Sequence, residues 1–96
     1  MIATNQSWQY KNITAITTGT LVRTGKGVLH AITLNKPVAT SVITVYDNTA
    51  ASGTVIGTIT VPASPLPVTL MYDVNYSTGL EIVVATAASD ITIAFS

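Results

Sequence analysis

Cysteine is absent from this chain of 96 residues, and charged side chains are rare. Without cysteine the chain can form no disulfide, no thiolate nucleophile and no Cys-based zinc site. Charged residues make up 8% of the sequence, whereas soluble domains average roughly 25%. Four basic and four acidic residues give a net charge of zero. Because net charge keeps identical molecules apart, a chain this neutral is expected to associate.

Long apolar runs and basic clusters are also missing. The longest apolar runs are short, such as residues 82–85, whereas a membrane-spanning helix needs about 20 residues. We therefore expect no membrane partner. The N-terminal residues show no basic segment followed by an apolar one, so no secretory signal is expected. Four scattered basic residues do not make a surface that follows phosphates, so no nucleic-acid partner is expected either.

Residues suited to β-strands dominate what remains. Thr, Val and Ile account for 17, 11 and 10 residues, and their branched Cβ atoms favour a pleated sheet. Apolar and polar residues alternate in residues 42–46, 80–84 and 91–95, which is the period of a half-buried strand. Turn signals separate eight predicted strands: 13–17, 20–23, 28–35, 40–47, 54–61, 68–73, 80–85 and 91–95. This spacing predicts a single all-β antiparallel sandwich of about seven or eight strands, of the jelly-roll or immunoglobulin-like type.

The first dozen residues, "MIATNQSWQYKN", are polar and do not alternate. They predict an N-terminal arm over residues 1–12 and a sandwich domain over residues 13–96. Trp8, Tyr10 and Lys11 lie in this arm. Trp and Tyr are frequent interface anchors, so these three residues are candidate partner-binding residues. The alternative is a plug that folds over an open end of the sandwich.

Motifs for chemistry are weak. "RTGKGV" at residues 23–28 lacks the spacing of a phosphate-binding loop and is followed by a predicted strand, so it is interpreted as a Gly-rich hairpin turn. His30 is the one histidine, with no nucleophile motif beside it. The acidic residues occur singly along the chain rather than in pairs. Three N-x-S/T sequons occur, but Ser and Thr are frequent enough that sequons are expected by chance. We therefore expect no catalytic residue, no metal and no cofactor.

The stretch "YDVNYSTGLEIVV", residues 72–84, is predicted to be a hairpin. One strand would end near Asp73, Gly79 would supply a positive φ in the turn, and a return strand would begin at Leu80. Glu81 would be the outward residue of that strand. The Pro-rich residues 62–67 are predicted to be a loop that crosses between sheets, and Gly57 marks a possible bulge.

Three segments resemble small virion proteins of tailed double-stranded DNA phages. They are "TGKGVLHAITLN" (24–35), "SVITVYDNTAASGTVIGTI" (41–59) and "YDVNYSTGLEIVVATAASDITIAF" (72–95). The resemblance implies a small β-sandwich without catalytic residues. It also implies a place among capsid decoration (cement) proteins, head fibres or tail parts. The short N-terminal arm departs from fibre-type members, which carry long stalks.

The leading hypothesis is thus a decoration protein that binds the major capsid protein and stabilises the head shell. We expect a homo-oligomer, with a trimer favoured, on the capsid surface of virions made in the host cytoplasm. The alternative is a receptor- or glycan-binding knob of a head fibre or tail, using residues 47–53 and 62–67. A third hypothesis is a small hydrolase that depends on His30.

Overall fold

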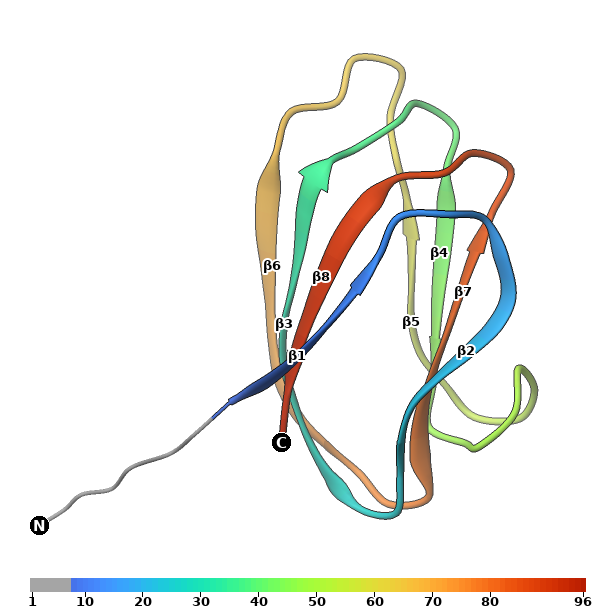
Figure 1. Ribbon diagram of the computed structural model, residues 1–96, viewed down its shortest axis with the longest axis vertical. Coiled ribbons are helices and arrows are strands. Elements are labelled where there is room, and N and C mark those ends of the chain that lie inside the picture. The colour runs from blue at the N-terminus through green and yellow to red at the C-terminus, as the bar shows by residue number, and fades with distance from the viewer. Residues whose placement is uncertain (1–7) are drawn as a thin grey trace, which may run out of the picture.

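The computed structural model describes residues 8–96, which form eight antiparallel strands in two packed four-stranded sheets (Figure 1). The strands are β1 (Gln9–Ile13), β2 (Thr17–Thr24), β3 (Gly27–Lys36), β4 (Val42–Tyr46), β5 (Val55–Thr60), β6 (Val68–Tyr76), β7 (Gly79–Ala85) and β8 (Asp90–Phe95). The predicted all-β sandwich is confirmed. This part of the chain contains no helix long and apolar enough to cross a membrane.

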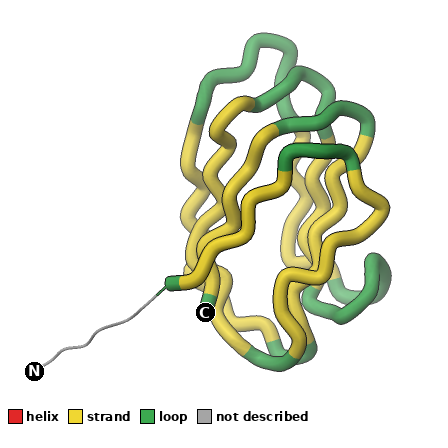
Figure 2. Tube along the Cα trace, viewed as in Figure 1, coloured by secondary structure: helices red, strands yellow, loops and turns green. Residues whose placement is uncertain are grey.

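Strand order distinguishes between the two predicted types of sandwich. Sheet I has the order β1-β8-β3-β6, and sheet II has the order β2-β7-β4-β5. Every connection crosses from one sheet to the other except β4–β5, which is a hairpin. This is the order of an eight-stranded jelly roll built from two Greek keys. The crossing connections gather at the two ends of the sandwich (Figure 2).

The core lies between the sheets and follows the alternation seen in the sequence. In β8 the buried residues are Ile91, Ile93 and Phe95, and in β7 Leu80, Ile82 and Val84 have no exposed surface. Strands β3 and β4 add Leu29, Ile32, Ile43 and Val45, which are also fully buried. Burial of an aliphatic side chain of this size contributes about 1.5–3 kcal/mol to stability. These two inner faces therefore supply most of the fold's favourable free energy.

The N-terminal part of the sandwich differs from the prediction. A strand was expected over residues 13–17, but β1 ends at Ile13 and β2 begins at Thr17. Residues 9–12, which were expected in the arm, form β1 and pair in continuous register with β8. Alternation is missing in β1 because the strand lies at the edge of the sheet, where its first four residues stay exposed on both faces. Residues 1–7 of the predicted arm, with the sequon at Asn5, lie outside the described residues.

The predicted hairpin over residues 72–84 is wrong. Strand β6 pairs with β3 in sheet I, while β7 pairs with β2 and β4 in sheet II. The turn between them is thus a crossing connection. Gly79 is not among the described residues with positive φ. It is required because a Cβ there would lie 2.9 Å from the Asn48 carbonyl oxygen and 3.0 Å from that of Arg23.

The turn at residues 23–28 is likewise a crossing between sheets rather than the predicted hairpin turn, since β2 and β3 lie in different sheets. Gly25 has a φ of 93°, a conformation that favours glycine. Its amide donates to the Thr78 carbonyl oxygen over 2.9 Å, which joins two crossing turns at one end of the sandwich. The predicted crossing loop at residues 62–67 is confirmed, because it leads from β5 in sheet II to β6 in sheet I. The register of β4 and β5 shifts beside Gly57, where a bulge was predicted.

Asp47 anchors the same end of the sandwich. Its carboxylate accepts the backbone N–H groups of Ser77 and Thr78, at 3.0 and 2.9 Å, and that of Gly79 at 3.4 Å. The hydroxyl of Ser77 also donates to it. These bonds connect the end of β4 to the β6–β7 crossing. The backbone donors, Thr78 first and Ser77 second, lower the pKa of Asp47 below its usual value of 3.8.

We predict that Asp47→Asn lowers the free energy of unfolding at neutral pH by about 1 kcal/mol, because the amide replaces a charged acceptor of several N–H groups. Since the pKa is lowered in the folded state, the stabilisation is present above the pKa of the unfolded chain. It is lost as the pH falls through the folded pKa. Urea unfolding at pH 7 and at acid pH measures the difference, which should shrink at the acid end.

Ser77→Ala is the matched control. It removes one hydroxyl donor and leaves the backbone donors in place, so its effect should be smaller. Equal stability of wild type and Asp47→Asn at neutral pH would contradict the role of Asp47.

Candidate functional site

Two irregularities in sheet I bring a histidine and an aspartate together on its outer face. The register between β3 and β8 shifts between Leu29 and Ala31, which leaves His30 as an extra residue. The register between β3 and β6 shifts at the same level. There Asp73 has a φ of 50°, a conformation that Asp tolerates better than most residues. Bulges re-aim side chains, and here they direct His30 and Asp73 toward each other.

The two side chains form a short hydrogen-bonded pair. The Nδ1 atom of His30 lies 2.5 Å from Oδ1 of Asp73, with 28% and 59% of the respective side chains exposed. The imidazole N–H donates to the carboxylate. This bond fixes the orientation of the imidazole ring. Because the pair is exposed to water, it contributes little to the stability of the fold. Its main effect is to orient the imidazole ring.

Trp8 stacks on the same imidazole. The two ring centroids are 4.2 Å apart and the ring planes differ by 7°. Trp8 directly precedes β1, His30 belongs to β3 and Asp73 to β6. We call these three residues the Trp8 stack. It extends from one edge strand of sheet I to the other and holds the indole ring in one orientation.

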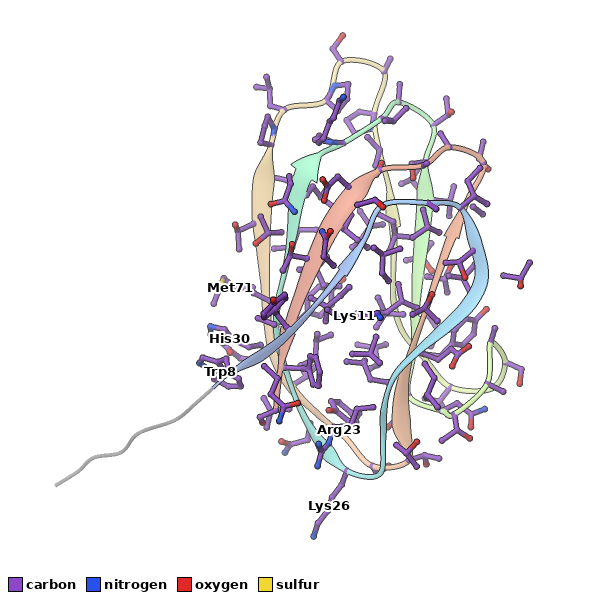
Figure 3. All side chains as sticks on the ribbon, viewed as in Figure 1. Trp8, Lys11, Arg23, Lys26, His30 and Met71 are labelled. Carbon is purple, nitrogen blue, oxygen red and sulfur yellow. The ribbon has the colours of Figure 1, made fainter. Side chains whose placement is uncertain are left out.

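Exposed apolar side chains surround the stack. Tyr10 is 76% exposed, Met71 is 59% exposed and Trp8 is 39% exposed. Tyr10 pairs with Ala94, Ala94 pairs with Ala31, and Ala31 pairs with Met71. These four residues form one row across sheet I, with Tyr10 and Met71 at its two ends. Trp8, His30 and Met71 project from the same flank of the molecule, on the side of sheet I that faces away from sheet II (Figure 3). We call this surface the Trp8 face.

A polar cluster borders the Trp8 face along the same sheet. The amide of Asn12 donates to Oδ1 of Asp90 over 2.8 Å, and the amide of Asn35 donates to the same oxygen over 3.1 Å. Both amides also donate to the hydroxyl of Thr92. Hydrogen bonds from Asn12, then from Asn35, lower the pKa of Asp90. The outer side of sheet I thus carries an aromatic region next to a row of amides and hydroxyls.

The structure separates the three residues predicted to bind a partner. Trp8 and Tyr10 lie on the Trp8 face. Lys11 pairs with Ile93, whose side chain is buried in the core, so Lys11 points to the opposite side of β1. In Figure 3 its amine lies away from Trp8, and Arg23 and Lys26 are also remote from the stack.

His30, Asp73 and Met71 were not predicted as members of a common site. His30 was interpreted as a residue on a sheet face, which agrees with its position in β3. Its partnership with Asp73 depends on the two bulges, and these arise from pairing between distant strands. The positive φ at Asp73 has no signature in the sequence beyond the residue type itself.

Glu81 was predicted to be an outward residue of its strand, and it is buried. It lies on the outer side of sheet II, with 6% of its surface exposed. Gly19 and Ala51 lie close to it, and a Cβ at Gly19 would collide with Oε2 of Glu81. The close approach of Gly19, in the neighbouring strand β2, therefore helps to bury a side chain that alternation alone places in solvent. Within residues 8–96 its Oε1 has no hydrogen-bond partner.

Other chemical features are sparse in the described region. Residues 8–96 contain no group of three His, Asp or Glu side chains placed to hold a metal ion. No pocket occurs in this part of the chain, so the candidate site is an open surface. Among the same residues no Ser or Thr hydroxyl hydrogen-bonds to the imidazole of His30, whose recorded partner is Asp73.

Comparisons of the chain with models of protein families, with curated proteins and with solved structures found no match.

We predict that His30→Ala frees the indole ring of Trp8. Because Trp8 is the one tryptophan in the chain, its fluorescence reports on the stack alone. Emission should shift to longer wavelength, and quenching by acrylamide should increase, since the face covered by the imidazole becomes exposed to water. Thr33→Ala is the control. Thr33 lies on the same strand as His30, but its hydroxyl hydrogen-bonds to the hydroxyl of Thr69, so this change should leave the emission unchanged. Identical spectra for wild type and His30→Ala would contradict the stacked arrangement.

Proposed function

We propose that the chain is a non-enzymatic structural protein of a tailed-phage virion. In this proposal it is a decoration protein that binds the major capsid protein on the outer surface of the head and stabilises the shell as an oligomer. The resemblance in residues 24–35, 41–59 and 72–95 supports the phage origin. The jelly-roll strand order is compatible with it, because viral capsid domains are among the proteins that use this architecture.

The Trp8 face is the observation that carries the binding role. Trp and Tyr supply a large part of the binding energy in many protein interfaces. Here the indole ring is already held by His30 and Asp73 before any partner arrives. A side chain ordered in advance loses less conformational entropy on binding. Tyr10 and Met71 add exposed apolar surface beside it.

Stabilisation of the shell would follow from linkage. A protein that binds the assembled lattice and not its separated subunits stabilises the lattice by its binding free energy. Several copies joined in one oligomer bind more tightly than one copy, because the second contact becomes intramolecular. The chain needs no catalytic group for this role, and its neutral surface allows copies to lie close together.

A second candidate function is glycan binding by a fibre or tail knob. The favouring observation is the position of exposed Trp8 and Tyr10 beside the amides of Asn12 and Asn35. Aromatic rings and amides together can contact the apolar faces and hydroxyl groups of a sugar. Of the two loops first expected to carry such contacts, 47–53 and 62–67, the first begins at Asp47, whose carboxylate is tied to the β6–β7 crossing. A glycan array separates the two functions, because a decoration protein should bind no glycan on it.

We predict that Trp8→Ala weakens binding to phage heads by roughly 30-fold, the effect of losing a hot spot of about 2 kcal/mol. The partner is the purified head of the phage that encodes this chain, prepared from a mutant that does not make it. Co-sedimentation with a concentration series gives the affinity. Tyr10→Ala should also weaken binding.

Lys11→Ala is the matched control, because Lys11 neighbours Tyr10 in sequence and points to the other side of β1. Its affinity should equal that of wild type. Deletion of residues 1–12 would be a poorer test, since it removes most of β1. Absence of wild-type protein from the sedimented heads would refute the proposed function. Equal loss in Trp8→Ala and Lys11→Ala would refute the role of the Trp8 face.

A further inference from the structure

Each sheet of the sandwich ends in two edge strands, and an exposed edge is a template for another strand. The edges are β1 and β6 in sheet I, and β2 and β5 in sheet II. Natural proteins protect such edges with bulges, prolines or charge. The four edges differ in these protections.

Three of the edges are protected within residues 8–96. Pairing of β2 with β7 is interrupted by two register shifts. β5 is irregular opposite Tyr46 and is followed closely by Pro62. β6 directly follows Pro67 and is bent at Asp73 by a positive φ. Each of these features interrupts the regular row of N–H and C=O groups that a new strand requires.

The edge of β1 has one of these protections, the charge of Lys11, and lacks the bulge and the proline. All five of its residues pair with β8 without a register shift. The strand contains no proline, no positive φ is recorded in it, and its charge is limited to Lys11. Its first four residues are exposed. In the described part of the chain β1 is therefore the edge best suited to extend a sheet.

We infer that β1 pairs antiparallel with β1 of a second copy, so that two molecules share one continuous sheet across a two-fold axis. A second copy is the occupant favoured by charge. Identical chains with a net charge of zero do not repel each other, and a two-fold axis lets the same edge serve both molecules. This inference rests on the proposed function in one respect: the pair would be the oligomer that binds the phage head. A two-fold pair takes the place of the trimer expected from the sequence.

Side-chain pairing indicates the register. In an antiparallel pair across a two-fold axis, one residue faces its own copy. Lys11 at that position would place like charges opposite each other, which destabilises a sheet. Tyr10 at that position creates an aromatic cross-strand pair, which stabilises it. The register centred on Tyr10 also places Lys11 opposite the uncharged Gln9 of the second copy.

This arrangement leaves the Trp8 face open. Strand pairing uses the edge of sheet I, whereas the stack lies on its outer side. The two-fold axis runs perpendicular to the shared sheet, so both Trp8 faces point in the same direction. The pair would thus present two copies of the binding surface to one target and gain from avidity.

Cross-linking through an introduced cysteine tests the pairing and its register. The chain contains no cysteine, so Tyr10→Cys introduces a lone thiol. Residues directly opposite in an antiparallel pair have Cβ atoms about 4.5–5.5 Å apart, close enough for a disulfide after a small adjustment. On mild oxidation Tyr10→Cys should form covalent dimers several-fold faster than Lys11→Cys or Gln9→Cys. The latter two are matched controls on the same exposed strand.

Sedimentation equilibrium supplies a second measurement, which needs no introduced cysteine and begins with the unmodified protein. The expected result is a monomer–dimer equilibrium, shifted toward monomer in Tyr10→Lys and restored when Tyr10→Lys is mixed with Tyr10→Glu. A wild-type protein that stays monomeric at high concentration would overturn the inference, as would cross-linking that is fastest at Lys11. Neither experiment uses phage heads, so failure of the pairing is distinguishable from failure of the proposed function.

Discussion

The two sheets of this protein are held together by burying their apolar inner faces against each other. With 8% charged residues and no disulfide, the chain has few charged groups to form ion pairs and no covalent cross-link to stabilise it. Fully buried side chains such as Ile32, Ile43, Ile82 and Ile93 come from the central strands of both sheets. Because successive strands other than β4 and β5 lie in opposite sheets, this core forms only when distant segments meet. If the packing there were lost, the turns, the edge strands and the outer face of sheet I would lose their ordered structure together.

The candidate site is a product of the same constraint. Strand β3 lies inside sheet I, between β8 and β6, and its inward residues fix its position. Two bulges then turn His30 and Asp73 toward each other on the other side of the strand. Trp8 gains a fixed orientation by stacking on the imidazole. A rigid sheet thus supports a preorganised aromatic surface, which is the condition under which a few side chains can bind a partner tightly.

Much of the fold is predictable from alternation, and the parts that are not predictable share a cause. Strands β3 to β8 follow from the period of two, because each is buried on one side or flanked by strong turn signals. Strand β1 escaped prediction because an edge strand exposed on both faces has no period. Gly79 was misinterpreted because Arg23, Asn48 and Thr49 surround it, and Glu81 because Gly19 of the neighbouring strand lies against its carboxylate. Of the site, Trp8 and Tyr10 were identified by residue type, whereas the contact between His30 and Asp73 arises from pairing between strands.

In the proposed function this chain acts by contact, through the outer side of sheet I. A cryo-EM reconstruction of phage heads that carry the protein tests it most directly. We expect the indole ring of Trp8 to lie against a capsid subunit, with Tyr10 and Met71 inside the buried interface. A map in which sheet I faces solvent, and the protein contacts the head through its opposite sheet, would contradict it.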